Sequence, residues 1–318
     1  MKTLVRLASI TLAIAAIAYF AVHAKRTLSG HEMASLATAP SLAGLVLLIV
    51  LFGSSIATNA IAWSWQLRAL GQPHRLRTCL AILASTQFGK YMPGNVGQHI
   101  GRIALARRAG ISMSAALLTA LYEVVLAIVA SAHIAGLALV LAPPAVIAGN
   151  ELFQQRWLLV GGATLFALVG LVLAPRAAAW LLRRRAQDSF EVPLQPENLQ
   201  LPMTAMIASY AMYVCSLSLV GLGLWGMSLA IGNGGAMPGP IFFIGAFTTS
   251  WIAGFVVPGA PAGLGVREVV LTAWLAGALP PATAVLLVVA LRIATTIADL
   301  VNFLWGSAVL VRNRQQQP

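Results

Sequence analysis

Two glycine-rich stretches of the sequence carry side chains that could bind a charged ligand. They read GKYMPGNVGQHIGR (89–102) and PGAPAGLGVRE (258–268). A helix that begins after a proline–glycine break presents unpaired backbone N–H groups and the positive end of its dipole. Glycines let a phosphate approach that backbone, and lysine and arginine add full charges. The pattern predicts an anion-binding site whose substrate-binding residues are Lys90, Gly94, Gly97, His99, Arg102, Gly259, Gly263, Gly265, Arg267 and Glu268.

Further ionisable residues lie inside apolar segments, where a charge costs about 2.5–3.5 kcal/mol at the membrane centre. They are Glu123, Arg292 and Asp299, and we predict that they line or gate a polar path. We expect Glu123 to pair with Arg292, either to line a water-accessible cavity or to fix helix packing. Asp299 follows Arg292 by seven positions, which is too far for direct contact. Glu268 is expected to orient Arg267 or to meet Lys90.

The two glycine-rich stretches resemble each other. GKYMPG (89–94) and GFVVPG (254–259) share the pattern G-x-x-x-P-G at an offset of 165 residues, which also aligns Ser85 with Ser250 and Arg102 with Arg267. The pattern predicts an internal repeat, and two kinked helices that merely pack together are the alternative. Repeats with interrupted helices are typical of secondary transporters, which bind their substrate between the halves.

The composition indicates that a membrane surrounds these stretches. Of the 318 residues, 59% are hydrophobic and 9% are charged, against about 25% charged in soluble domains. The formal charge of +12 comes from arginines and lysines at the ends of apolar stretches. Such placement follows the positive-inside rule, and we therefore expect no nucleic acid partner.

Apolar stretches of about 20 residues predict transmembrane helices. The two apolar stretches that contain the glycine-rich motifs, 78–106 and 241–279, are interrupted and are expected to form re-entrant hairpins. The first segment could instead be a signal peptide, and we prefer an uncleaved span. The predicted spans are 4–23, 41–63, 111–141, 157–175, 204–231 and 282–311.

The predicted fold is an all-α polytopic membrane protein with about six full transmembrane helices and two re-entrant hairpins. Three spans in each half require the halves to be inverted, with a first repeat over 1–156 and a second over 157–318. Basic flanks around 78–106 put that hairpin on the cytoplasmic side, and 241–279 on the outer side. Both termini are then cytoplasmic, in the cytoplasmic (inner) membrane.

The sequence shows no nucleophile elbow, P-loop or metal-ligand spacing, so we expect neither a metal nor another cofactor. The leading expectation is a transporter, not an enzyme. A membrane-embedded enzyme that modifies a lipid headgroup is the alternative, with Lys90, His99 and Glu268 as acid–base groups. A lipid-binding accessory subunit is the third.

The stretches FGKYMPGNVGQHIGR, followed by ARRAG, and PGAPAGLGVREVVL resemble the two signature stretches of the lysylphosphatidylglycerol synthase transmembrane family, a flippase-like domain. The resemblance covers essentially the whole chain, and P-G-x-P-x-G-L-G-x-R-E is its more specific part. The run Val96 to His99 departs from the family pattern, which leaves the lipid unidentified. No aminoacyltransferase accompanies the membrane part, so we expect a stand-alone member and a separately encoded lipid-biosynthesis enzyme.

The resemblance implies that the protein moves a lipid, anionic or modified in its headgroup, across the cytoplasmic membrane. The headgroup would bind between the two hairpin loops while the acyl tails stay in the bilayer. Glycines in the spans 157–175 and 204–231 permit close helix packing, within one chain or between the copies of a homo-oligomer.

Overall fold

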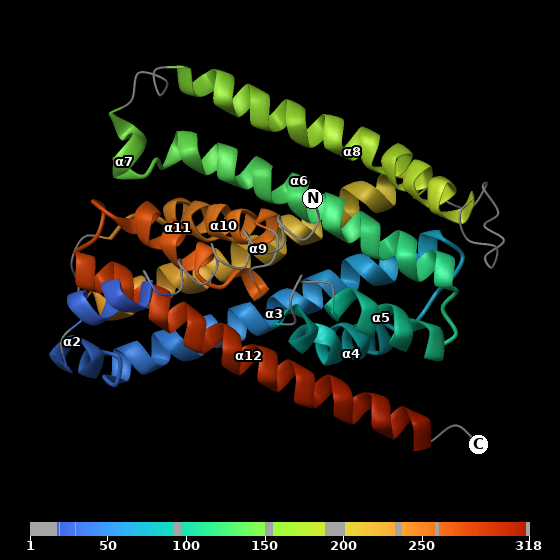
Figure 1. Cartoon of the computed structure of the whole chain (residues 1–318), viewed down its shortest axis with the longest axis horizontal. Helices are drawn as coiled ribbons and strands as arrows, with labels where there is room; N and C mark the ends of the chain where they lie inside the picture. The colour runs from blue at the N-terminus through green and yellow to red at the C-terminus, as the bar shows by residue number, and fades with distance from the viewer. Residues whose placement is uncertain are drawn as a thin grey trace.

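The computed structural model describes residues 18, 20–28, 30–91, 97–149, 155–187, 201–232, 237–257 and 261–315, and the regular elements in these ranges are helices (Figure 1). The first part contains α2 (Gly30–Ser35), α3 (Ala39–Ala69), α4 (Leu76–Thr86), the 3₁₀ helix η1 (Gln87–Tyr91), α5 (Gly97–Arg108), α6 (Met113–Leu141) and α7 (Ala145–Ala148). The second contains α8 (Arg156–Gln187), α9 (Met203–Ile231), α10 (Pro240–Val256), the 3₁₀ helix η4 (Pro261–Gly263), α11 (Val266–Leu275) and α12 (Pro281–Gln315).

Four of these helices are long and apolar enough to cross a membrane: α3, α6, α9 and α12. They contain the predicted spans 41–63, 204–231 and 282–311 and nearly all of 111–141, which confirms an all-α polytopic membrane protein. The predicted span 157–175 lies in α8, whose apolar stretch Trp157–Leu173 is shorter. The predicted span 4–23 lies largely outside the described residues.

Local sequence explains where the long helices begin. Proline stands at or next to the first position of α3, α10 and α12, where its missing N–H costs no hydrogen bond. α6 begins after Ser112, whose hydroxyl accepts a hydrogen bond from the backbone N–H of Ala115. The apolar residues that follow have no interior proline in α3, α6 or α9, so these helices continue for 29 to 31 residues.

Both apolar stretches that the sequence predicts to be interrupted are broken helices. The first, α4–η1–α5, starts and ends at the right-hand end of the molecule in Figure 1; the second, α10–η4–α11, starts and ends at the left-hand end. Residues 92–96 and 258–260, which include Gly94 and Gly259, lie outside the described residues. The broken elements therefore approach the interior from opposite ends of the bundle.

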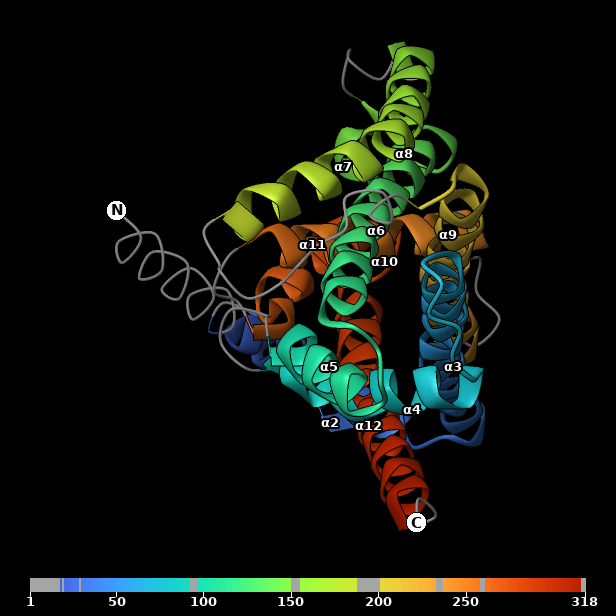
Figure 2. The ribbon, with the colours of Figure 1, turned by 90° about the vertical axis from the view of Figure 1, so that its right-hand side faces the viewer.

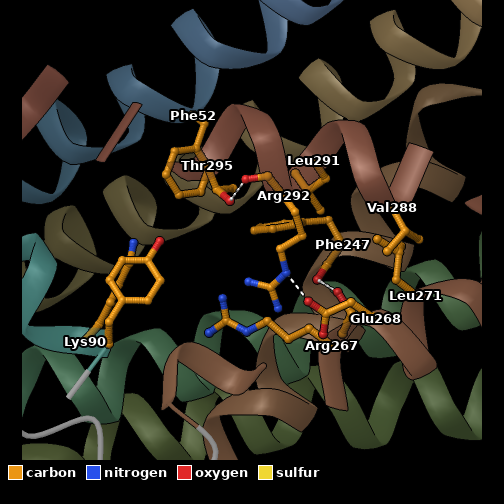
Figure 3. A pocket seen from close by; sticks show the side chains of 12 residues that line it. Phe52, Lys90, Phe247, Arg267, Glu268, Leu271, Val288, Leu291, Arg292 and Thr295 are labelled. Atoms are coloured by element: carbon orange, nitrogen blue, oxygen red, sulfur yellow. Dashed lines mark hydrogen bonds and ion pairs between the residues drawn. The ribbon is translucent and has the colours of Figure 1, made fainter. Parts of the chain in front are cut away.

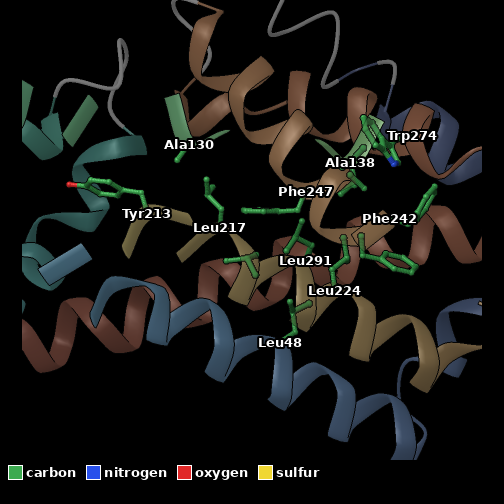
Figure 4. Close-up of a cluster of buried hydrophobic side chains, with 14 of the residues drawn as sticks. Leu48, Ala130, Ala138, Tyr213, Leu217, Leu224, Phe242, Phe247, Trp274 and Leu291 are labelled. Carbon is green, nitrogen blue, oxygen red and sulfur yellow. The ribbon is translucent and has the colours of Figure 1, made fainter. Parts of the chain in front are cut away.

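The long helices pack closely because small residues face their neighbours. α3 runs along α9, where a Cβ added at Gly223 would lie 3.2 Å from the Cα of Leu48. α8 packs along α6 at the edge of the molecule (Figures 1 and 2). Figure 4 shows the central apolar cluster, in which Leu48 of α3, Leu224 of α9 and Phe247 of α10 meet α12.

Each broken element packs against the long helix that follows the other one. α4 contacts α12, and α10 contacts α6. A Cβ added at Gly306 of α12 would lie 2.7 Å from the carbonyl oxygen of Ala81 in α4, so the two backbones meet almost directly. This crossed packing brings η1 and η4, and the charged residues next to them, to the middle of the protein.

Candidate functional site

Two cavities lie between the broken elements and the long helices. Together with the open space at their mouths, the smaller has about 450 Å³ of empty space and the larger about 1060 Å³. Four residues line both and therefore separate them: Phe52, Lys90, Phe247 and Arg267. The smaller cavity also reaches Tyr91, Ser250, Glu268, Leu271, Val288, Leu291, Arg292 and Thr295 (Figure 3).

Lys90 of η1 pairs with Asp299 of α12, which is fully buried. The Lys90 ammonium lies 2.7 Å from one carboxylate oxygen, and the Tyr91 hydroxyl donates to the other at 2.7 Å. Both oxygens of Asp299 therefore have a donor. The expectation that Lys90 meets Glu268 is wrong, because η1 lies against α12 and turns Lys90 toward Asp299.

Arg102 of α5 pairs with Glu123 of α6. Both terminal nitrogens of the guanidinium donate to the carboxylate, one of them at 2.6 Å, and Arg102 is only 3% exposed. The predicted Glu123–Arg292 pair is wrong, because α5 packs back against α6 and brings Arg102 to Glu123 first. The Glu123 carboxylate thus neutralises Arg102, which the sequence analysis predicted to bind the ligand.

Arg292 of α12 pairs with Glu268 at the start of α11. One oxygen of this buried carboxylate accepts from Nε of Arg292, and the other accepts from the backbone N–H of Gly265 at 2.7 Å. Glu268 therefore caps its own helix. Gly265 is one of the predicted substrate-binding residues, and its backbone N–H is already bonded to Glu268.

Arg267 is different from the other cations of the cluster. Among the described residues, no carboxylate lies within 4 Å of its guanidinium, and its buried Nε has no hydrogen-bond partner. The guanidinium carbon lies 5.9 Å from the ring centre of Trp251. In Figure 3, Arg267 and Arg292 face one open space, with Lys90 across from them.

Two glycines make room for Arg267. A Cβ added at Gly254 would lie 2.5 Å from Cγ of Arg267, and one added at Gly263 would lie 2.6 Å from its Nε. Gly263 also has a φ of +71°, which favours glycine. Gly263 therefore leaves the space that the Arg267 side chain occupies. The sequence analysis predicted instead that Gly263 contacts the ligand directly.

The remaining predicted residues lie at the larger cavity or near it. His99 lines that cavity, and its buried Nδ1 has no partner among the described residues. Gly97 is the first residue of α5. Sequence reasoning missed Tyr91, although it adjoins Lys90, and it missed the aromatic pair Trp251 and Phe255, which a spacing of four in a helix places on one face.

The charges of this cluster do not cancel. Lys90, Arg102 and Arg292 each have a carboxylate, and Arg267 is left as a fourth cation. Within the described ranges, no group of three or more metal-ligating His, Cys, Asp or Glu side chains gathers. The arrangement offers one surplus positive charge at the wall between the two cavities.

A comparison with family models supports the resemblance noted from the motifs. The model of the lysylphosphatidylglycerol synthase TM region matches residues 6–301, which include both broken elements and every residue of the charged cluster. No match was found among curated proteins. The chain belongs to the lysylphosphatidylglycerol synthase transmembrane-region family.

Proposed function

We propose that this protein translocates an anionic or headgroup-modified lipid across the cytoplasmic membrane. The observation that carries the proposal is Arg267, a guanidinium with no carboxylate partner among the described residues, placed where the two cavities meet. A planar guanidinium binds a phosphate through two parallel hydrogen bonds. A phosphate at this position neutralises the surplus charge of the cluster.

The outer surface supports a bilayer location for the acyl tails. α8 and α12 expose large apolar side chains, which water would solvate poorly and lipid covers well. Examples, all more than half exposed, are Leu158, Leu165, Val301 and Leu304. The headgroup would occupy the polar interior while the tails remain among these outer faces.

The packing also supports the inverted repeat, with halves 1–156 and 157–318. α3 and α9 occupy equivalent places in the two halves and run in opposite directions in Figure 1. The broken elements lie at opposite ends, and each packs against the long helix that follows the other. In such a plan both broken elements are re-entrant, and rocking of one half against the other alternates access to the site.

The distribution of arginines supports an orientation. Basic residues stand at the last turns of α3 and α5 and at the start of α4. These helix ends and the end of α12 lie at the right-hand end of the molecule in Figure 1. They include Arg68, Arg75, Arg107 and Arg108. By the positive-inside rule this end is cytoplasmic, and the C-terminus is then cytoplasmic as well.

Transport fits the cluster better than catalysis. Two of the three predicted acid–base groups are fixed in ion pairs, Lys90 with Asp299 and Glu268 with Arg292 and the Gly265 N–H. A general acid or base must exchange a proton with the substrate, and groups held in this way are poorly placed to do so.

The test uses proteoliposomes that contain phosphatidylglycerol labelled on an acyl chain, with dithionite to bleach the outer leaflet. We expect the wild type and Arg68→Gln, an exposed arginine at the end of α3, to translocate at equal rates. Arg267→Gln should lower the rate at least about tenfold, since a hydrogen bond to a charged group contributes about 1.5–3 kcal/mol.

Equal rates for Arg267→Gln and the wild type, with both proteins folded, would contradict the proposal. Mass spectrometry of the recovered lipid separates transport from catalysis. Unchanged lipid mass supports translocation, whereas a protein-dependent change in headgroup mass would establish an enzyme.

A further inference from the structure

We infer that the two cavities select a lipid whose headgroup carries one phosphodiester charge and is otherwise uncharged and rich in hydroxyl groups, and that they reject headgroups with a free ammonium group. This inference rests on the proposed translocation and names the class of lipid. It separates the protein from a carrier of aminoacylated lipids, whose headgroups carry such a group.

The carboxylates of the cluster are the first argument. An ammonium group that leaves water needs a negative partner, because burying an unpaired charge is costly. Glu123 is held by both terminal nitrogens of Arg102, and Asp299 is held by Lys90 and Tyr91. Glu268 is held by Arg292 and the Gly265 N–H, so each carboxylate of the cluster is already neutralised by a cation of the protein.

Displacing one of these partners does not solve the problem. A headgroup ammonium that took Glu123 would leave Arg102, 3% exposed, as an unpaired buried cation. The same exchange at Asp299 would leave Lys90 unpaired beside Arg267, since both line the same cavities. Each exchange adds one positive charge to a cluster that already has a surplus.

The surplus charge is the second argument. A phosphodiester carries one negative charge, which matches the one unpaired guanidinium, Arg267. Arg292 lies beside it in Figure 3, and its buried Nη2 has no hydrogen-bond partner among the described residues. The two arginines therefore offer one net charge together with further N–H donors, which suits a phosphate with two free oxygens.

The lining of the larger cavity is the third argument. Apart from Lys90, Glu123 and Arg267, its polar lining consists of amide, hydroxyl and imidazole side chains, and such groups both donate to and accept from hydroxyl groups. Two of them have a buried atom without a partner among the described residues: Oδ1 of Asn59 and Nδ1 of His99. The polar lining consists of Ser55, Asn59, Gln87, Gln98, His99, Tyr213 and Ser216.

An aromatic surface completes this cavity. Trp251 and Phe255 stack with ring centres 5.2 Å apart and an angle of 9° between their planes, and both line the cavity. Arg267 lies against the same Trp251 ring. The C–H face of a glycerol or sugar unit packs on such rings, directly next to the arginine that would bind its phosphate.

The experiment compares translocation of acyl-labelled lipids that differ only in headgroup, by the wild type in proteoliposomes of neutral phosphatidylcholine. Phosphatidylglycerol and phosphatidylinositol have one phosphodiester charge and free hydroxyl groups. Phosphatidylserine has the same net charge but contains an ammonium group, phosphatidylethanolamine is zwitterionic, and lysylphosphatidylglycerol is cationic. We expect the first two to move at least about tenfold faster than the last three. The comparison between phosphatidylglycerol and phosphatidylinositol shows whether a glycerol or a ring-shaped headgroup is preferred.

Two variants and one control variant test which residues produce this preference. Arg267→Gln should slow both hydroxylated lipids to the rate of the others, while Arg68→Gln should leave the preference intact. Asn59→Leu should reduce the advantage of phosphatidylglycerol over phosphatidic acid, which has no headgroup hydroxyls beyond the phosphate.

The outcomes distinguish the two levels of the proposal. If lysylphosphatidylglycerol or phosphatidylserine moves as fast as phosphatidylglycerol, and Arg267→Gln slows all of them, translocation stands and the headgroup selection is wrong. If no lipid moves faster than in protein-free vesicles, the proposed function is wrong as well.

Discussion

The Arg102–Glu123 pair allows a quantitative test of whether an arginine of the first glycine-rich stretch is structural. Arg102 is 3% exposed, and both terminal nitrogens donate to Glu123. Glu123→Gln removes the negative charge and leaves a buried guanidinium without compensation. Such a change costs about 3–5 kcal/mol, whereas replacing both partners by apolar residues is often close to neutral.

We therefore expect Glu123→Gln and Arg102→Met each to lower the free energy of unfolding by about 3 kcal/mol or more. The double variant Arg102→Met with Glu123→Gln removes both charges and should lose only about 1 kcal/mol, which corresponds to a coupling energy of about 5 kcal/mol when each single variant loses about 3 kcal/mol. The assay is equilibrium unfolding in mixed micelles of dodecyl maltoside and sodium dodecyl sulfate. Arg68→Gln, at an exposed position, is the control and should unfold like the wild type.

Two results would refute this reasoning. A loss below about 1 kcal/mol for Glu123→Gln would mean that Arg102 is solvated or bound elsewhere. Additive losses in the double variant would mean that the two residues do not act as a pair. Since Arg102 is assigned to packing and Arg267 to the lipid, the folded double variant should also keep translocating phosphatidylglycerol.

Three further changes probe the surroundings of Arg267 and Lys90. Gly254→Ala places a Cβ 2.5 Å from Cγ of Arg267 and should lower the rate of lipid translocation, although alanine normally stabilises a helix relative to glycine by up to about 1 kcal/mol. The control Gly161→Ala adds a Cβ that meets nothing within 4 Å and should leave the rate unchanged. Tyr91→Phe removes one of two donors to Asp299 and should cost about 2 kcal/mol in mixed-micelle unfolding. A loss larger than that of Glu123→Gln would contradict the pairing of Asp299 with Lys90. Asp299→Asn frees Lys90 and should raise the affinity for phosphatidylglycerol vesicles about tenfold while lowering the rate of translocation. An increase in both the affinity and the rate would contradict the proposed role of the Lys90–Asp299 pair.

The sequence predicts the scaffold of this protein well. Apolar length predicts α3, α6, α9 and α12, and the glycine–proline motifs predict where two helices are interrupted. These signals are local, because an uninterrupted apolar run of sufficient length forms a helix wherever it lies. The inverted relation of the halves and the re-entrant path through a bilayer stay predictions.

The partners within the charged cluster could not be predicted in the same way. Arg292 and Asp299 lie on roughly one face of α12, yet they contact different elements, Glu268 of α11 and Lys90 of η1. Which residue meets them depends on how two broken helices dock from opposite ends, and helical spacing carries no such information. Arg102 and Arg267 show the same limit, since they align in the repeat but only Arg102 has a carboxylate partner among the described residues.

The positions of the three ion pairs indicate how a lipid headgroup could be coupled to movement. Arg102–Glu123 joins α5 to α6 within the first half, and Glu268–Arg292 joins α11 to α12 within the second. Lys90–Asp299 is the pair, among those the structure describes, that crosses between the halves, and Lys90 lines both cavities together with Arg267.

A phosphate bound at Arg267, as we propose, would compete with Asp299 for Lys90, because Lys90 lines the same cavities as Arg267 and both anions attract its ammonium group. Binding of the headgroup would then weaken the connection between the halves, and its departure would restore it. A ligand shifts an equilibrium only by binding two states unequally, and this exchange would supply the difference. For this reason Asp299→Asn is expected to hold the lipid more tightly and still move it more slowly.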